Sequence, residues 1–213
     1  MPVPPSGYFP VSLNLAGRPC LIIGGGPVAA RKARRLLDGG ALVTVIAPQI
    51  CDDMAALSPV TLLPREYAPG DVTGFRLVIT ATGITSVDGA VFDDAEAAGV
   101  WVNSADDIAH CSFIMPSVHQ DGPVTVAIST GGTSPALASW LRRRVGADLG
   151  PGLGQLAALL GEARTRLRDA GVSTEHVDWS GLLDGPLPAL VRQGRIEEAR
   201  ALLADVVRQH IPG

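Results

Sequence analysis

Three glycines at residues 24–26 stand between an apolar run and a helical pattern. A strand, a tight glycine turn and a helix start, in that order, form a site for the pyrophosphate of a dinucleotide, because the first N–H groups of the helix and its dipole face the anion. Gly24 allows the turn, Gly26 lets the pyrophosphate approach the backbone, and Ala29 lets the helix pack closely on the strand. The turn therefore predicts dinucleotide binding; a glycine turn that binds nothing is the alternative.

The acidic residue that usually ends the next strand of such a site is missing. An Asp or Glu there would bind the adenosine ribose, but the segment at 41–47 continues into Pro48 and Gln49. No Arg stands there to accept a 2′-phosphate either. The residues of this strand do not decide between NAD and NADP. We favour NAD because no basic residue stands there to bind the 2′-phosphate of NADP.

Two adjacent carboxylates, Asp106 and Asp107, follow the strand expected at residues 100–103. At the ligand edge of a parallel sheet, one of them could act as the general base beside a nicotinamide. Equally, Asp106 could only cap a turn, which is a common use of Asp. His110 is a weaker candidate for the same edge. Neither the histidines nor the three cysteines show metal-ligand spacing, so we expect no resident metal.

A second polar segment, residues 129–135, leads into another helix start. It could form an anion cradle, or it could be a plain strand-to-helix connection in which Ser134 is the N-cap and Pro135 the first helical residue. The residues alone favour the connection. The three arginines at 142–144 are more typical of a solvated helix face than of a substrate clamp.

The elements that position these residues alternate between strand and helix. Their strands read as apolar runs, as parallel strands buried on both faces do. The pattern predicts an α/β, Rossmann-like parallel sheet, with the glycine turn and the segments 80–83 and 103–107 at its carboxyl edge. Strands are expected at 19–23, 41–46, 60–63, 76–80 and 100–103, and helices at 27–38, 86–98 and, briefly, 52–57.

The alternation stops after residue 111. Residues 112–118 and 123–129 predict two strands joined by a turn at 119–122, which contains Asp-Gly. A helix over 135–144, a glycine-rich linker at 150–154 and further helices at 155–169, 175–184, 187–193 and 196–207 follow. We expect three parts: a dinucleotide-binding domain at 1–111, a hairpin and helix at 112–150, and a C-terminal helical domain at 151–213.

Composition excludes several classes of protein. A net charge of −4 and 4% aromatic residues argue against nucleic-acid binding. The sequence contains no run of 18 apolar residues and no signal-peptide pattern, so we expect neither a membrane span nor secretion. Three widely spaced cysteines fit a reducing compartment, which predicts a cytoplasmic location.

Five segments, taken in order, resemble one family. They lie at residues 8–11, 24–32, 103–106, 112–117 and 129–135, and the pair Phe-Ile-Met-Pro-Ser with Ser-x-Gly-Gly-Thr-Ser-Pro is their most specific part. Together they resemble the siroheme-synthase dehydrogenase family, which comprises precorrin-2 dehydrogenases, some of them also sirohydrochlorin ferrochelatases. The likeness covers residues 8–150 well and the C-terminal helices only in general character.

The resemblance implies NAD-dependent oxidation of the tetrapyrrole precorrin-2 to sirohydrochlorin, with Asp106 as the acid–base residue. It also implies a homodimer in which the element at 112–150 crosses to the partner, and it leaves open whether Fe²⁺ is transiently bound and inserted. The rival is a Rossmann protein that senses NAD(H) without chemistry. The expected cofactor-binding residues are Gly24, Gly25, Gly26, Pro27, Val28, Pro48, Gln49, Ala81 and Thr82. The expected substrate-binding residues are Asn103, Ser129, Thr130, Gly131, Gly132, Thr133 and Ser134.

Overall fold

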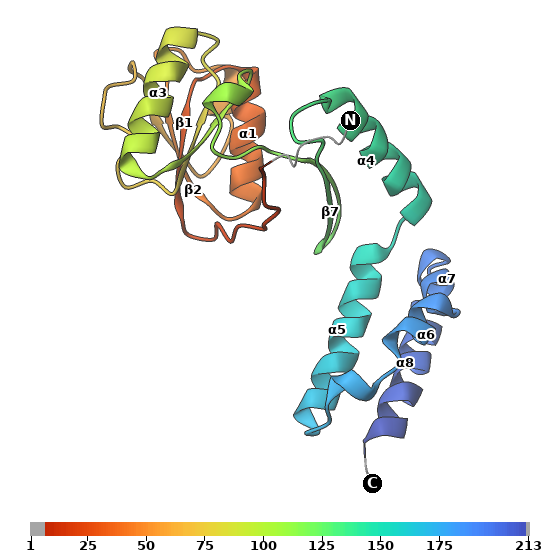
Figure 1. The fold of residues 1–213 in the computed structure, drawn as a ribbon. Coiled ribbons are helices and arrows are strands. Elements are labelled where there is room, and N and C mark those ends of the chain that lie inside the picture. Colours follow the sequence, from red (N-terminus) through yellow and green to blue (C-terminus); the bar gives the residue numbers. More distant parts are fainter. Residues whose placement is uncertain (1–6, 212–213) are drawn as a thin grey trace. The chain divides into compact units, whose positions relative to one another are not determined.

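The computed structural model of the protein describes residues 7–211. The chain divides into two compact units, the first ending at Met115 and the second beginning at Pro116 (Figure 1). We describe each unit by itself.

The first unit contains a five-stranded parallel sheet, which confirms the predicted fold class. The strand order β3-β2-β1-β4-β5 places the first strand in the middle, so the chain leaves it toward one side and later returns on the other. A ligand crevice forms at such a switch point, outside the carboxyl ends of the strands. The strands are β1 (Pro19–Ile23), β2 (Leu42–Ile46), β3 (Val60–Leu63), β4 (Leu77–Thr80) and β5 (Trp101–Ser104).

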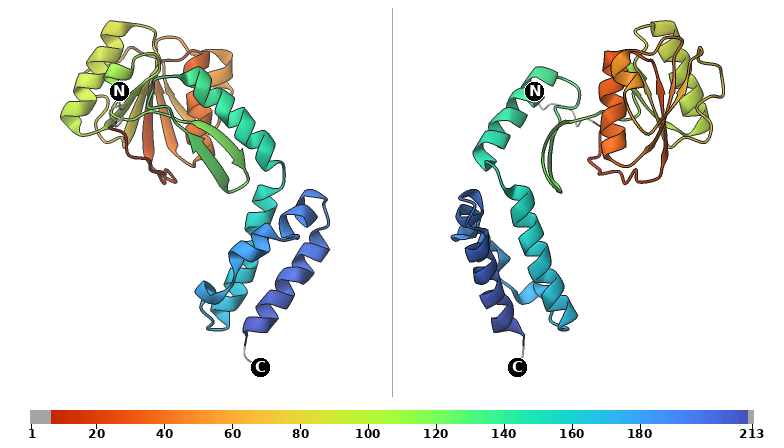
Figure 2. Two further views of the ribbon diagram at one scale, coloured as in Figure 1. Left: turned by 45° about the vertical axis from the view of Figure 1, so that its right-hand side comes forward. Right: turned by 180° about the vertical axis from the view of Figure 1, so that it is seen from behind.

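Helices cover both faces of this sheet, as Figures 1 and 2 show. On one face, Cys20 and Ile22 of β1 pack in a cluster with α1 (Pro27–Asp38) and α2 (Asp52–Ala55). On the other face, Leu21 and Ile23 pack in a cluster with α3 (Thr85–Ala98). Successive side chains of a strand point to opposite faces, so a strand covered on both faces must be apolar throughout. This explains the apolar runs in the sequence.

The second unit begins with an antiparallel hairpin of β6 (Ser117–Asp121) and β7 (Val124–Ile128), followed by α4 (Pro135–Leu149). The predicted strand at 112–118 and the turn at 119–122 are wrong. His119 lies within β6, and the turn consists of Gly122 and Pro123 alone. Residues 112–115 belong to the first unit, where the backbone N–H of Ser112 donates to the carbonyl of Val102 at 2.9 Å.

Helices form the rest of the second unit and share one apolar core. Leu167, Leu187 and Ala199 are fully buried in it. The predicted helix at 175–184 is divided between a 3₁₀ turn at Thr174–His176 and α6, and the last helix extends three residues beyond its predicted end. None of the helices within residues 7–211 is long and apolar enough to cross a membrane. The helices are α5 (Leu153–Asp169), α6 (Trp179–Asp184), α7 (Leu187–Arg192) and α8 (Ile196–His210).

Candidate active site

The glycine turn after β1 is pressed between two neighbouring loops. A Cβ at Gly24 would lie 2.4 Å from the carbonyl oxygen of Ala81, and one at Gly25 would lie 2.0 Å from that of Gln49. Gly24 also has φ +125°, which side chains rarely adopt. Both positions therefore require glycine, and the structure brings two predicted cofactor residues, Ala81 after β4 and Gln49 after β2, against the turn.

Gly26 differs from the two glycines before it, because a Cβ there would meet nothing within 4 Å. It is the N-cap of α1, no side chain caps that helix, and no acidic residue lies in its first turn. Pro27 follows at the first helical position, where its missing N–H is not needed. The first-turn N–H groups of α1 thus remain available for an anion, and these residues fit the pyrophosphate of a dinucleotide.

Some of the other predicted cofactor residues are exposed, whereas Thr82 is hydrogen-bonded within the protein. Val28, Pro48 and Gln49 are exposed at the carboxyl edge of the sheet. Thr82, in contrast, uses its hydroxyl within the protein: Oγ1 donates to Oδ1 of Asp88 at 2.8 Å and accepts from the N–H of Ile84 at 3.0 Å. A contact between Thr82 and a cofactor remains a prediction.

Asn103, near the end of β5, is buried and bound at both ends of its amide. Its side chain is 5% exposed. Nδ2 donates to the carbonyl of Phe113 at 3.0 Å, and Oδ1 accepts from Nζ of Lys32 at 3.1 Å. This environment suits a residue that orders the surrounding loops, and direct binding of substrate by Asn103 remains a prediction.

The two carboxylates that follow β5 have different surroundings. Asp106 is exposed and makes no hydrogen bond or ion pair with any residue in the described range 7–211. Asp107 caps the 3₁₀ turn at Ile108–His110, where Oδ1 accepts from the N–H of Ala109 at 3.0 Å and Oδ2 lies 2.7 Å from Nδ1 of His110. The bond to His110 holds the pKa of Asp107 below its usual range. The capping role that we considered for Asp106 therefore belongs to Asp107.

Sequence reasoning missed Lys32. It lies on the face of α1 that also carries the buried residues Ala29 and Leu36, three positions before it and four after it, and this spacing was the available signal. Nζ donates to Oδ1 of Asn103 and lies 3.6 Å from Sδ of Met115. Burial lowers the pKa of this ammonium.

The predicted substrate segment at 129–134 lies in the second unit and folds onto itself before α4. Ser134 is the N-cap of that helix, as predicted: its side chain accepts from the N–H of Leu137 at 3.3 Å. Thr130 Oγ1 accepts from the N–H of Ser134 at 3.1 Å, and Thr133 Oγ1 donates to the carbonyl of Thr130 at 2.6 Å. The loop is well ordered by its own bonds, and its contact with substrate stays a prediction.

Two glycines in this loop have backbone conformations that favour glycine. Gly131 and Gly132 have φ +60° and +82°, which other residues rarely adopt.

Farther along α4, Nε of Arg144 lies 3.4 Å from Asp148, one turn later, and both side chains are exposed. This pairing agrees with a solvated helix face at residues 142–144.

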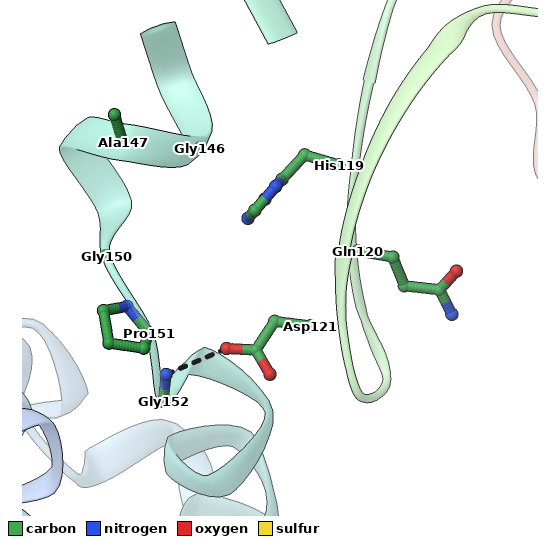
Figure 3. A pocket seen from close by; sticks show the side chains of 8 residues that line it. All are labelled: His119, Gln120, Asp121, Gly146, Ala147, Gly150, Pro151 and Gly152. Carbon is green, nitrogen blue, oxygen red and sulfur yellow. Dashed lines mark hydrogen bonds between the residues drawn. The ribbon is translucent and has the colours of Figure 1, made fainter. Parts of the chain in front are cut away.

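A hollow of about 500 Å³ lies within the second unit, between β6 and the junction of α4 with α5 (Figure 3). Asp121 in its wall accepts the N–H groups of Gly152 and Leu153 at 2.9 and 2.7 Å, so its carboxylate serves the start of α5. His119 packs against Gly146, and its Nε2 is buried without a partner in the described part of the chain. Within residues 7–211, no three His, Cys, Asp or Glu side chains gather to hold a metal.

Comparison with known proteins places these features in a family context. Residues 11–117 match the family model described as "Putative NAD(P)-binding", and residues 121–147 match the model described as "Sirohaem biosynthesis protein central". The chain is 40% identical over 204 residues to a siroheme synthase of Methylococcus capsulatus, which covers 93% of this chain and 43% of that relative. It is 41% identical over 181 residues to siroheme synthase 1 of Aeromonas salmonicida, covering 83% and 39%.

The fold also matches a solved structure, that of SirC, precorrin-2 dehydrogenase. The TM-score is 0.76 at 24% sequence identity, and the match covers 91% of this chain and 99% of that chain. The chain spans less than half the length of the two siroheme synthases.

Proposed function

The chain belongs to the family described as "Putative NAD(P)-binding" and also matches the central model of sirohaem biosynthesis proteins, and from this premise we propose that it oxidises precorrin-2 to sirohydrochlorin with NAD⁺. In this reaction the reduced macrocycle loses a hydride, which the cofactor accepts, and a proton, which a base accepts. The enzyme's main tasks are then to hold the two reactants together and to present one base.

The observation that carries this proposal is the open space at Gly26 beside the uncapped start of α1. A purely structural turn would have no need of glycine at this position, because the protein itself would accommodate a side chain there. A pyrophosphate lying on the N–H groups of α1 does require it. When bound, NAD⁺ supplies the hydride acceptor at the carboxyl edge of the sheet.

Asp106 is our candidate for the base. It follows β5, whose carboxyl end lies on the same edge as the glycine turn after β1. Because its carboxylate is exposed and unpaired among the described residues, it can accept a proton without first breaking a bond to the protein. Asp107 is less suited to that role, since its carboxylate is occupied by Ala109 and His110.

We propose NAD rather than NADP as the cofactor. The loop after β2 contains Pro48 and Gln49 and no arginine or lysine, so nothing in it would neutralise a 2′-phosphate. The absence of the usual ribose carboxylate at that position favours neither cofactor.

The remaining parts of the proposal concern partners and location. The loop at 129–134 and the start of α4 would receive carboxylates of the substrate, because a protein of net charge −4 needs local positive ends to bind a polyanion. We also propose a homodimer formed through β6, β7 and α4, a cytoplasmic location, and Fe²⁺ only as a transient substrate.

The test is an anaerobic incubation of the purified chain with precorrin-2 and NAD⁺, followed by absorbance. We expect the bands of sirohydrochlorin to rise only when NAD⁺ is present. A protein that binds NAD⁺ but leaves precorrin-2 unchanged would be a sensor of NAD(H), and the dehydrogenase proposal would be wrong.

A further inference from the structure

The side chain of Lys32 makes a polar connection between helix α1 and the strand that leads to Asp106. Its ammonium donates to Oδ1 of Asn103 at 3.1 Å and contacts Sδ of Met115 at 3.6 Å. Asn103 also binds the segment after β5, because its Nδ2 donates to the carbonyl of Phe113 at 3.0 Å. Helix α1, strand β5 and the segment at 111–115 therefore meet at one amide.

The side-chain amide of Asn103 lies close in sequence to the proposed base, so its bond to Lys32 bears on the proposed oxidation. Asn103 is three residues before Asp106, and Lys32 is five residues after the start of α1 at Pro27. A bond between them fixes the distance between the helix that would hold the pyrophosphate and the loop that would hold the base. Small errors in such a distance are costly, since a displacement of about 1 Å can lower a rate about 100-fold.

A half-buried ammonium is a costly means of joining two elements, because part of its hydration is lost. Lys32 has three N–H donors, and the described residues offer it one amide oxygen and one thioether, which is a weak acceptor. A methionine or leucine would pack there without the cost of removing a charge from water. The charge is therefore more than a packing device.

The ionisable groups around Lys32 come from its own helix and from the segment beyond β5. Burial is the main cause that lowers the pKa of Lys32; Arg35 and Arg31 of its own helix act in the same direction, while Cys111 and Asp106, both beyond β5, oppose the shift. Asp106 therefore lies on the segment whose charge favours the protonated form of Lys32. Loss of the proton from Lys32 would weaken the hydrogen bond to Asn103, because a charged donor makes the stronger bond.

We propose that Lys32 is a positioning residue for the proposed oxidation: its ammonium, bound to Asn103, sets the place of the loop that carries Asp106. The inference rests on the proposed function and adds a residue to it. Lys32 acts through Asn103 and Asp106, so its removal should impair turnover more than cofactor binding.

The experiment compares Lys32→Met, Lys32→Arg and the matched control Arg34→Met with the wild type. Arg34 lies on the exposed side of the same helix, so its replacement removes an equal charge without touching Asn103. For each protein we would measure kcat and KM for precorrin-2, the Kd for NAD⁺ and the thermal unfolding midpoint. We expect Lys32→Met to lower kcat about 10- to 100-fold with the Kd for NAD⁺ within about twofold, and Arg34→Met to match the wild type.

The pH profile separates positioning from a merely structural role. In the wild type, kcat should fall on the alkaline side as Lys32 loses its proton, below the ordinary range of a lysine because its pKa is lowered. Lys32→Arg keeps its charge at every accessible pH, so it should regain part of the lost kcat and should lack that alkaline fall. This arm decides the question even if Lys32→Met does not fold.

Three outcomes are distinguishable. Turnover in the wild type with an unchanged kcat in Lys32→Met would overturn the inference and leave the proposed function intact. An alkaline fall that persists in Lys32→Arg would also overturn it. No turnover in the wild type, with NAD⁺ bound, would remove the proposed function and the inference together.

Discussion

Oδ2 of Asp107 lies 2.7 Å from Nδ1 of His110, whereas the adjacent Asp106 has no partner within the described residues. Two neighbouring carboxylates are thus assigned to different tasks by their surroundings. His110 in turn packs edge-on against the ring of Phe92, with 5.1 Å between the ring centroids. The contact fixes the loop after β5 from one side and leaves Asp106 available on it.

The first prediction follows from this difference. Asp106→Asn removes the only proton acceptor that we assign, so kcat for precorrin-2 oxidation should fall about 100-fold or more, while NAD⁺ still binds. Asp107→Asn and His110→Ala should lower kcat much less, because they change the support of the loop and leave the base in place. Steady-state kinetics of the three variants would check this, and near-normal turnover in Asp106→Asn would assign the proton to another group.

The second prediction contrasts Gly26 with Gly25. Gly26→Val should fold normally, because the protein leaves its Cβ free, but it should raise KM and Kd for the cofactor, whose pyrophosphate needs that space. Gly25→Ala should instead lower stability by about 1–3 kcal/mol, since its Cβ would overlap the carbonyl of Gln49. Thermal unfolding and calorimetric titration with NAD⁺ measure both effects. A Gly26→Val protein with unchanged affinity would place the cofactor elsewhere.

The third prediction concerns cofactor choice. Since the loop at Pro48 and Gln49 offers no cation to a 2′-phosphate, kcat/KM should be no higher with NADP⁺ than with NAD⁺. Gln49→Arg should raise the relative use of NADP⁺, because a guanidinium can bind the phosphate. A clear preference of the wild type for NADP⁺ would reveal a basic group from another part of the protein.

The fourth prediction tests the second unit. Asp121→Ala removes a carboxylate that accepts two N–H groups at the start of α5, so it should lower the free energy of unfolding by about 1–2 kcal/mol. Asp148→Ala is the control, since the ion pair of Asp148 with Arg144 is exposed, and its effect should stay below about 0.5 kcal/mol. Equal effects of the two variants would contradict the capping role of Asp121.

Most of the first unit could be predicted because its physical constraints are local. Strands covered on both faces must be continuously apolar, and the apolar run within residues 19–23 therefore identifies a buried strand. The glycine turn was recognisable for a similar reason, since Gly24 and Gly25 leave no room for a Cβ. The structure adds which loops impose that limit, those of Ala81 and Gln49.

The errors arose where contacts distant in sequence decide the structure. Residues 112–116 have the composition of a strand, yet Ser112 is bound to Val102 in the first unit, where its N–H donates at 2.9 Å and its Oγ accepts at 2.7 Å. Lys32 was missed because its acceptor, Asn103, is 71 residues away. A lysine on a helix face ordinarily extends its charge to water, and nothing nearby in the sequence shows that this one does not.

If this chain transfers a hydride from precorrin-2 to NAD⁺, both products must form in the same sample. The amounts of NADH and sirohydrochlorin can be followed together by absorbance in one anaerobic incubation. We expect NADH and sirohydrochlorin to appear together in equal amounts, with neither formed when NAD⁺ or the protein is omitted and much slower formation of both with Asp106→Asn. Sirohydrochlorin formed without NADH, or NAD⁺ bound with neither product formed, would contradict this expectation.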